Sequence, residues 1–288
     1  MMLICFRSLI LCLLAPMLVL HPLLAGAGTG PSLPAWQVLE FEEKAFWATA
    51  SSRLELTASP EDKTLWQFEA VSAVPGNSEQ VTMQLDPASG RLQRRERVSH
   101  GKQDSRLKSY VYADKHLLRE RREPSGQARS DAQNSDPSSW ALASQTKLFY
   151  PENKDRLVVT SPYLLIVIAS HLQQKGPGAS REVLVHTDEN FYHATLTCGT
   201  GIPVQANYKL ADGTTVTDTR ETLGVAIKVE PAGSLVDKDD FSLLGLSGDL
   251  LIFFDRQNDL PLQLRGVAPR IGDKAINLKS VKMRSATS

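Results

Sequence analysis

The sequence predicts a mainly β fold, in which a long antiparallel meander curls into a half-barrel or barrel around one buried helix at about residues 161–174. From Trp36 onward, apolar and polar residues mostly alternate with a period of two, which is typical of strands with one buried face. Turn residues separate these runs at short intervals, and short connections favour antiparallel neighbours. The concave face of a curled sheet must be filled, and residues 161–174 have the only convincing helical pattern.

The N-terminal residues have the pattern of a secretory signal peptide. Arg7 is followed by an uncharged, leucine-rich run over residues 8–20 and then by Ala25-Gly26-Ala27, a cleavage site of small residues. We predict a signal peptide over 1–27 with cleavage near Ala27, a linker over 28–35, and a single β-rich domain over 36–285. An uncleaved membrane anchor is the alternative. Prolines interrupt the segment, however, and a spanning helix needs about 20 apolar residues. No later run is that long, so the mature chain is predicted to have no transmembrane segment.

Charge and cysteine content exclude several classes of partner. Lysine plus arginine and aspartate plus glutamate number 32 each, so there is no basic excess for nucleic acid. Cys5 and Cys12 belong to the predicted signal peptide and leave Cys198 alone in the mature chain. We expect Cys198 to be a buried small hydrophobe.

The first half of the predicted domain reads as hairpins. Leu54 and Leu56 share one face of a strand, as do Phe68 and Ala70 of the next, and a Pro-Gly turn lies at 86–90. The charged residues 94–97 could form an anion-binding patch. A solvated sheet face with cross-strand Arg–Glu pairs is the preferred interpretation, because acids are interleaved with bases. Residues 124–139 are rich in Ser, Asp and Pro and are predicted to be a flexible insertion.

The predicted helix has clear end signals. Ser161 is expected to cap its N-terminus through the side-chain hydroxyl, Pro162 suits the first helical position, and Gly176 ends the helix. Its β-branched residues leave a strand over 163–169 as an alternative. Strands are expected to resume at 182–186, 191–198, 204–210, 225–230, 250–254, 260–264 and 275–283. A change of side-chain parity predicts a bulge or bend near Ser280 in the last of these strands.

Few residues suggest chemistry. His186 and His193 flank a hairpin-like tip that contains Asp188, and these three residues are weak candidates for metal ligands. The spacing sets of known metal sites are missing, so an ordinary polar turn is preferred. No catalytic residue and no cofactor is predicted. If the sheet leaves a cavity beside the helix, Tyr163, Ile166 and Val167 are the residues expected to line it and to bind a ligand.

Several short motifs resemble a known family. They are Leu85-Asp86-Pro87-Ala88-Ser89-Gly90-Arg91-Leu92, Ser109-Tyr110-Val111-Tyr112, Glu221-Thr222-Leu223-Gly224-Val225, the run 250–254, Asp259-Leu260-Pro261-Leu262 and Arg270-Ile271-Gly272-Asp273-Lys274-Ala275-Ile276-Asn277-Leu278. Together they resemble the proteobacterial periplasmic family called domain of unknown function 3108, over roughly residues 37–284. The resemblance implies an exported, β-rich protein located in the periplasm of Gram-negative bacteria, and it transfers no functional residues.

The leading functional hypothesis is therefore a non-enzymatic periplasmic protein that binds an apolar, lipid-like ligand or an envelope protein. One alternative is a hydrolase acting on cell-envelope polymers, with His186, Asp188 and His193 as its candidate site. The other alternative is a structural or assembly factor without a ligand.

Overall fold

The computed structural model of the chain describes residues 33–45, 48–74, 76–87, 90–101, 104–124, 134–151, 157–236, 238–269 and 271–285. The predicted signal peptide, its cleavage site near Ala27 and residues 125–133 of the predicted insertion lie outside these ranges. Within them the chain is mainly β-sheet, as predicted. No helix in this part of the chain is long and apolar enough to cross a membrane.

The first eight strands form an antiparallel meander, each pairing with the next. They are β1 (Trp36–Ala45), β2 (Ala48–Ala58), β3 (Trp66–Val74), β4 (Asn77–Leu85), β5 (Leu92–His100), β6 (Ser105–Tyr112), β7 (His116–Glu123) and β8 (Ala141–Phe149), with a short 3₁₀ turn at Pro137–Ser139 before β8. The register places Leu56 opposite Phe68, and both side chains are fully buried. Period-two alternation therefore identified the buried face correctly.

The remaining strands extend the same sheet from the other side of β1. They are β9 (Val159–Thr160), β10 (Ser180–His186), β11 (Phe191–Thr200), β12 (Val204–Leu210), β13 (Thr215–Arg220), β14 (Thr222–Pro231), β15 (Ser247–Asp255), β16 (Pro261–Ala268) and β17 (Gly272–Met283). β17 pairs with β1, and β14 pairs with both β11 and β15. The β12–β13 hairpin leaves this order and touches β17 through two parallel pairs.

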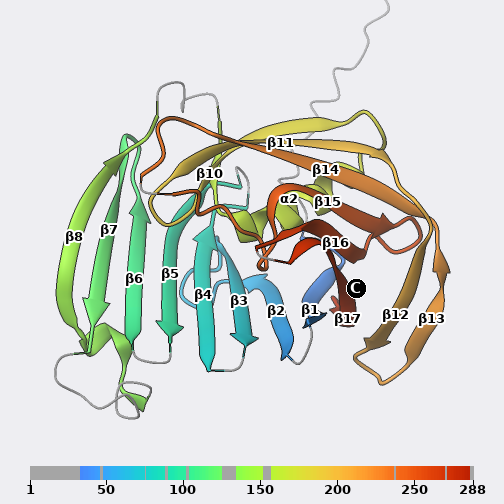
Figure 1. Cartoon of the computed structure of the whole chain (residues 1–288), viewed down its shortest axis with the longest axis horizontal. Coiled ribbons are helices and arrows are strands. Elements are labelled where there is room, and N and C mark those ends of the chain that lie inside the picture. The colour runs from blue at the N-terminus through green and yellow to red at the C-terminus, as the bar shows by residue number, and fades with distance from the viewer. Residues whose placement is uncertain are drawn as a thin grey trace, which may run out of the picture.

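One sheet thus runs from β9 through β17 and β1 to β8, and it does not close into a barrel. Figure 1 shows β1–β8 as one curved row, with β10, β11, β14 and β15 across the opposite side. In the β1–β17 pairing, Glu40 faces Ser280 whereas Phe41 faces Leu278. This skipped residue confirms the bulge predicted near Ser280.

The predicted helix is present and lies between the two halves of the sheet (Figure 1). A 3₁₀ turn at Pro162–Leu164 leads into α2 (Leu165–Gln173), so the strand alternative for 163–169 is wrong. All residues of α2 except His171 are buried. The helix packs against β11, β14 and β15, and the Nε1 of Trp36 in β1 donates to the Oγ of Ser170 at 3.4 Å.

The expected capping role of Ser161 is wrong. Its hydroxyl makes no cap hydrogen bond, and its buried Oγ has no hydrogen-bond partner among the described residues. The helix starts with a 3₁₀ turn instead, in which the N–H of Leu164 donates to the carbonyl of Ser161 at 3.0 Å. Cys198 is buried as expected, and burial raises the pKa of its thiol.

Replacing Ile166 by alanine tests the helix as a packed core element. The Ile166 side chain is fully buried, so Ile166→Ala should lower the free energy of unfolding by about 2–5 kcal/mol in urea unfolding. Leu142→Ala is the control, because Leu142 is 52% exposed. It should change the free energy by less than about 0.5 kcal/mol. Equal effects of the two substitutions would contradict this placement of the helix.

Candidate functional site

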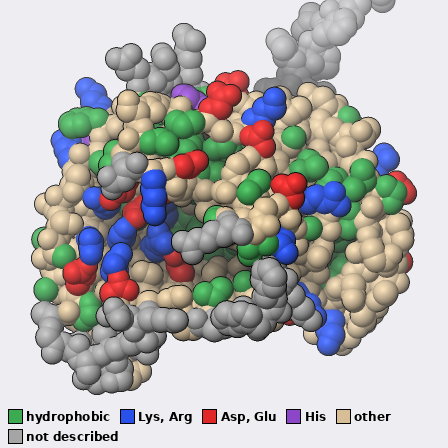
Figure 2. Space-filling view, in the orientation of Figure 1, with side chains coloured by type: hydrophobic (Ala, Val, Ile, Leu, Met, Phe, Trp, Pro, Cys, Tyr) green, Lys and Arg blue, Asp and Glu red, His purple; other side chains and the backbone are tan. Residues whose placement is uncertain are grey.

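A cavity of about 880 Å³ opens on the concave side of the sheet, beside the N-terminal end of the helix. Strands β2 to β6 form one wall. The opposite wall comes from four separate parts of the chain, which are residues 161–163, 187–190, 236 with 238–245, and 268–269 with 271. Figure 2 shows the hollow, with lysine and arginine side chains gathered beside it.

The strand wall of the cavity carries a row of polar side chains. Directly opposite residues in neighbouring antiparallel strands share one face of the sheet. The register makes such a row from Ser52, Ser72, Glu79, Ser99 and Arg106, one residue on each strand from β2 to β6. The hydroxyls of Ser52 and Ser72 lie 3.1 Å apart in a hydrogen bond. We call these five residues the polar row.

Deeper in the same face the sheet carries inward-facing cations. The next row pairs Val81 with Arg97 and Arg97 with Lys108, and the row beyond pairs Arg95 with Tyr110. The interpretation of residues 94–97 as a solvated face is therefore only half right. Arg94 and Glu96 do form an exposed ion pair at 2.6 Å. Arg95, by contrast, is buried, with only 5% of its surface exposed. The alternation of side chains along β5 puts Arg94 and Glu96 on one face of the sheet and Arg95 and Arg97 on the other. Which face is turned inward depends on the residues that pack against it from across the interior.

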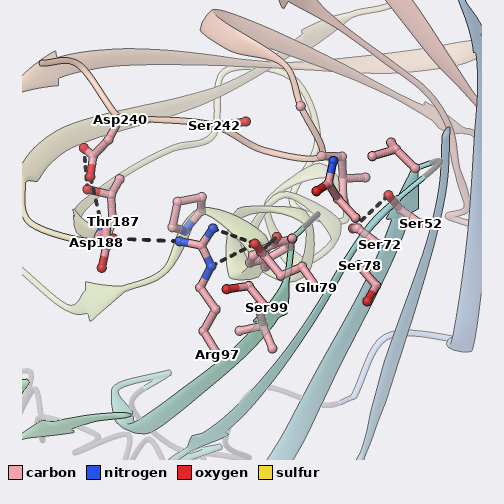
Figure 3. Close-up of a pocket in the computed structure, with 18 of the residues that line it drawn as sticks. Ser52, Ser72, Ser78, Glu79, Arg97, Ser99, Thr187, Asp188, Asp240 and Ser242 are labelled. Carbon is pink, nitrogen blue, oxygen red and sulfur yellow. Dashed lines mark hydrogen bonds and ion pairs between the residues drawn. The ribbon is translucent and has the colours of Figure 1, made fainter. Parts of the chain in front are cut away.

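Arg97 spans the cavity wall between two carboxylates (Figure 3). Its Nε donates to Glu79 at 2.8 Å, and its guanidinium lies 4.0 Å from Asp188. The hydroxyl of Tyr163 donates to Glu79 at 2.8 Å. Burial and then the charge of Glu79 raise the pKa of Tyr163, so the phenol keeps its proton. This set of bonds ties β4 and β5 to the start of the helix and to the β10–β11 turn.

Residues 187–190 connect β10 to β11, and we call them the bridging turn. On one side the turn is held by the first half of the sheet. Lys108 and Tyr110 both donate to Asp188, and Arg119 pairs with Glu189 at 2.6 Å. Arg95 donates to the carbonyl of His186 at 2.8 Å and to that of Thr187. Four side chains, one from β5, two from β6 and one from β7, thus donate to the bridging turn, and Arg95 also reaches the residue before it.

On its other side the bridging turn is held by Asp240. This carboxylate accepts from the Thr187 hydroxyl at 2.7 Å, the Asn190 amide at 2.8 Å and the Tyr192 hydroxyl at 3.0 Å. It also accepts from the backbone N–H of Asp188 at 3.2 Å. The loop at 238–245 is therefore fixed to the turn, and the turn to the strand wall. The shape of the cavity depends on both connections.

The predicted ligand-binding residues separate in the structure. Tyr163 lines the cavity, whereas Ile166 and Val167 are buried in the core and are not among the lining residues. The weak metal candidates also separate. His186 is fully buried, with its Nδ1 2.9 Å from the Tyr112 hydroxyl, while His193 is exposed and Asp188 is bound to Lys108. The described residues contain no group of three or more His, Cys, Asp or Glu side chains that could hold a metal.

His186 is a buried side chain with a structural role. Burial and then the positive charges of Arg95 and Arg119 lower its pKa well below the usual value, so the imidazole is neutral. Its ring packs against Phe191 with centroids 4.9 Å apart. These contacts describe a side chain that fills the interface between β10 and β6.

Sequence reasoning missed the serines of the cavity. Five of the lining residues have hydroxyls that form no hydrogen bond within the part of the chain that the structure describes, and they are Ser51, Ser78, Ser99, Ser161 and Ser242. These residues come from β2, β4, β5, the start of the helix and the loop before β15. No local pattern links them, because only the register of the sheet and the bridging turn bring them to one cavity.

Comparisons with known proteins identify no family. No family model matches the chain, and no curated protein does. One similar solved structure is the crystal structure of a beta-barrel-like protein of domain of unknown function DUF1849 from Brucella abortus. It has 8% sequence identity, covers 88% of this chain and 100% of its own, and gives a TM-score of 0.49. The resemblance to domain of unknown function 3108 stays a prediction.

The bridging turn predicts an acid-sensitive stability. Burial alone would raise the pKa of Asp240, but hydrogen bonds from Asn190 and Thr187 outweigh it and lower that pKa. The same balance, with bonds from Lys108 and Tyr110, lowers the pKa of Asp188. A lowered folded-state pKa stabilises the fold at pH values above the unfolded-state pKa of about 3.9. This contribution is lost as the pH falls through the folded-state pKa values.

Asp240→Asn should therefore lower the free energy of unfolding at pH 7 by about 1–3 kcal/mol, since a charged acceptor is lost. It should also flatten the fall in stability below about pH 4. Urea unfolding across a pH series measures both effects. Asp273→Asn, at an exposed position with no hydrogen bond or ion pair among the described residues, is the control. Parallel pH profiles for wild type and Asp240→Asn would argue against this role of Asp240.

Proposed function

We propose that this protein binds an amphiphilic small molecule in the cavity between the strand wall and the bridging turn. The proposal rests on one observation, which is that the cavity has a polar wall on its strand side and an apolar rim at its mouth. Val74, Val236 and Ile271 line the mouth of the cavity and are 45%, 50% and 42% exposed. Exposed apolar side chains gathered around a concavity are typical of binding sites.

The rim is assembled from three separate parts of the chain. Val74 ends β3, Val236 lies in the loop after β14, and Ile271 lies in the turn between β16 and β17. The volume of about 880 Å³ falls within the range of about 300–1,000 Å³ that is common for small-molecule sites. An apolar chain against the rim and a polar head group against the polar row would use both surfaces.

This proposal changes the ligand expected from the sequence. An apolar, lipid-like ligand was expected beside Tyr163, Ile166 and Val167, but the side chains of Ile166 and Val167 are buried, with 0% and 3% exposure. The cavity lies beside the N-terminal end of the helix instead, where Tyr163 joins polar side chains. Polar groups left dry against a purely apolar ligand would lose hydration without compensation.

The proposal includes export to the periplasm. It is supported by the basic Arg7, the apolar run over 8–20 and the small residues at 25–27. In this setting the protein would hold or carry an envelope amphiphile.

The test is native mass spectrometry of the full-length protein expressed in a Gram-negative host and purified gently from the periplasmic fraction. The expected result is a mature N-terminus near residue 28 and a bound amphiphile, which solvent extraction releases and identifies. The stripped protein should then bind the uncharged fluorophore N-phenylnaphthylamine.

Ser242→Trp should weaken this binding at least about tenfold by filling the cavity, since Ser242 lines it from an exposed position. Ser144→Trp, on the exposed β8, is the matched control and should bind like wild type. Equal binding by the two variants would place the fluorophore elsewhere and contradict the proposal.

A further inference from the structure

A second cavity, of about 610 Å³, lies between β12 and the strands β16 and β17, toward the right of Figure 1. It shares no lining residue with the cavity of the proposed function. One side is lined by every residue from Pro203 to Tyr208, so an edge of β12 faces the cavity and not only one of its side-chain faces. The other side is made by residues of β16 and β17, together with Glu42 of β1.

The backbone of β12 has unused hydrogen-bonding groups on this edge. Opposite residues of an antiparallel pair alternate between bonded and non-bonded pairs. The N–H of Leu210 donates to the carbonyl of Thr214 at 2.8 Å, so the even-numbered residues of β12 make the bonds to β13. The odd-numbered residues Gln205, Asn207 and Lys209 direct their N–H and C=O groups to the other edge. Lys209 pairs there with β17, whereas Gln205 and Asn207 have no backbone partner among the described residues.

This edge lacks the features that usually protect an open strand from pairing, which are bulges and charged side chains. Within the described residues β8 and β13 also have one edge without a partner strand. The β8 strand has a register shift against β7 and carries Lys147, and β13 carries Asp218 and Arg220. By contrast, residues 204–208 are uncharged and keep a regular register with β13.

The charged side chains that line this second cavity are mostly positive. They are three cations, Arg265, Lys274 and Lys279, and one carboxylate, Glu42. The Nε of Arg265 donates to the amide oxygen of Gln263 at 2.6 Å, and its Cζ lies 4.9 Å from the ring centroid of Phe253. These contacts hold the guanidinium in place, and its two terminal nitrogens have no acceptor among the described residues. A guanidinium held in this way is suited to pairing with a carboxylate.

We propose that the second cavity binds an extended, acidic segment of a partner protein, which adds a strand to the open edge of β12. The backbone groups of Gln205 and Asn207 exchange hydrogen bonds with this segment, and Arg265 pairs with one of its carboxylates. A strand of four residues takes about 13 Å along its axis, about 4.8 Å between strands and about 10 Å through the sheet, or roughly 600 Å³. The cavity of about 610 Å³ therefore has room for about four residues.

The experiment begins with random 12-residue peptides displayed on phage and selected against the purified wild-type protein. The enriched peptides are synthesised with a fluorescent label, and their affinities are measured by fluorescence anisotropy. We expect sequences in which β-branched or aromatic residues alternate with other residues, and which contain at least two Asp or Glu residues. Enrichment of no peptide, or only of peptides without acidic residues, would overturn the proposal.

Asn207→Pro tests the open edge. Proline has no N–H, and the hairpin should tolerate it because the N–H of Asn207 is not used in the pairing with β13. The enriched peptides should bind Asn207→Pro at least about tenfold more weakly than wild type. Asn207→Ala is the matched control, since it keeps the N–H and removes only an exposed side chain, and it should bind like wild type. Equal binding by the two variants would contradict the proposal.

Hydrogen exchange of the wild-type protein, followed by NMR, gives a reading that needs no variant. The backbone amides of Gln205 and Asn207 should exchange at least about tenfold more slowly with peptide bound, because peptide carbonyls then accept from them. The amide of Ala206, which is already bonded to β13, is the internal control and should change less. Unchanged exchange at 205 and 207 under saturating peptide would place the peptide elsewhere and overturn the proposal.

Arg265→Gln tests the preference for acidic segments. It should weaken binding of the acidic peptides about five- to tenfold and leave analogues with Gln and Asn in place of Glu and Asp unaffected, because only an ion pair is removed. Lys147→Gln on β8 removes the same charge outside the cavity and should leave both affinities unchanged. An equal loss for acidic and neutral peptides would overturn the assignment of Arg265 to a carboxylate.

Light scattering separates a partner protein from a second copy of this chain. The wild-type protein should be a monomer without peptide. A wild-type dimer that Asn207→Pro converts to a monomer would assign the edge of β12 to self-association and overturn the partner proposed here.

Discussion

The bridging turn at 187–190 is the constraint on which the cavity depends. Its residues accept hydrogen bonds from β5, β6 and β7 on one side and donate them to Asp240 on the other. A long sheet twists and curls, but twist alone does not fix how far its two ends stand apart. The polar contacts at this turn set that separation on one side of the helix, while α2 fills the interior behind it.

This arrangement explains why one part of the interior is a packed apolar core and another part is a cavity with polar side chains. Beside Leu165 and Ile166 the space between the halves of the sheet is filled by packed apolar side chains. The helix begins beside the cavity, and toward the mouth the strand wall changes from Met83 and Val81 to Glu79 along β4. A cavity with a polar wall and an apolar rim therefore lies next to the first residues of the helix. The geometry therefore favours an amphiphile over a wholly apolar ligand.

Much of the fold could be predicted from local patterns, whereas the cavity could not. Alternation located the strands around Leu54 and Phe68, and Pro162 and Gly176 marked the helix, because these signals act within a few residues. Alternation also placed Arg95 and Arg97 on one face but could not tell which face would be buried. That depends on Asp188 and on the carbonyls at 186 and 187, which are far along the chain and brought close only by the sheet. The hydroxyl of Ser161 failed as a cap for the same reason, since the start of the helix is positioned by its packing.

The most direct test of this account is a crystal structure of the mature protein with dodecyl maltoside. We expect the polar head group over the polar row, and the dodecyl chain along Val74, Val236 and Ile271. A cavity that holds only water, with the detergent bound elsewhere or on the outer face of the sheet, would contradict it.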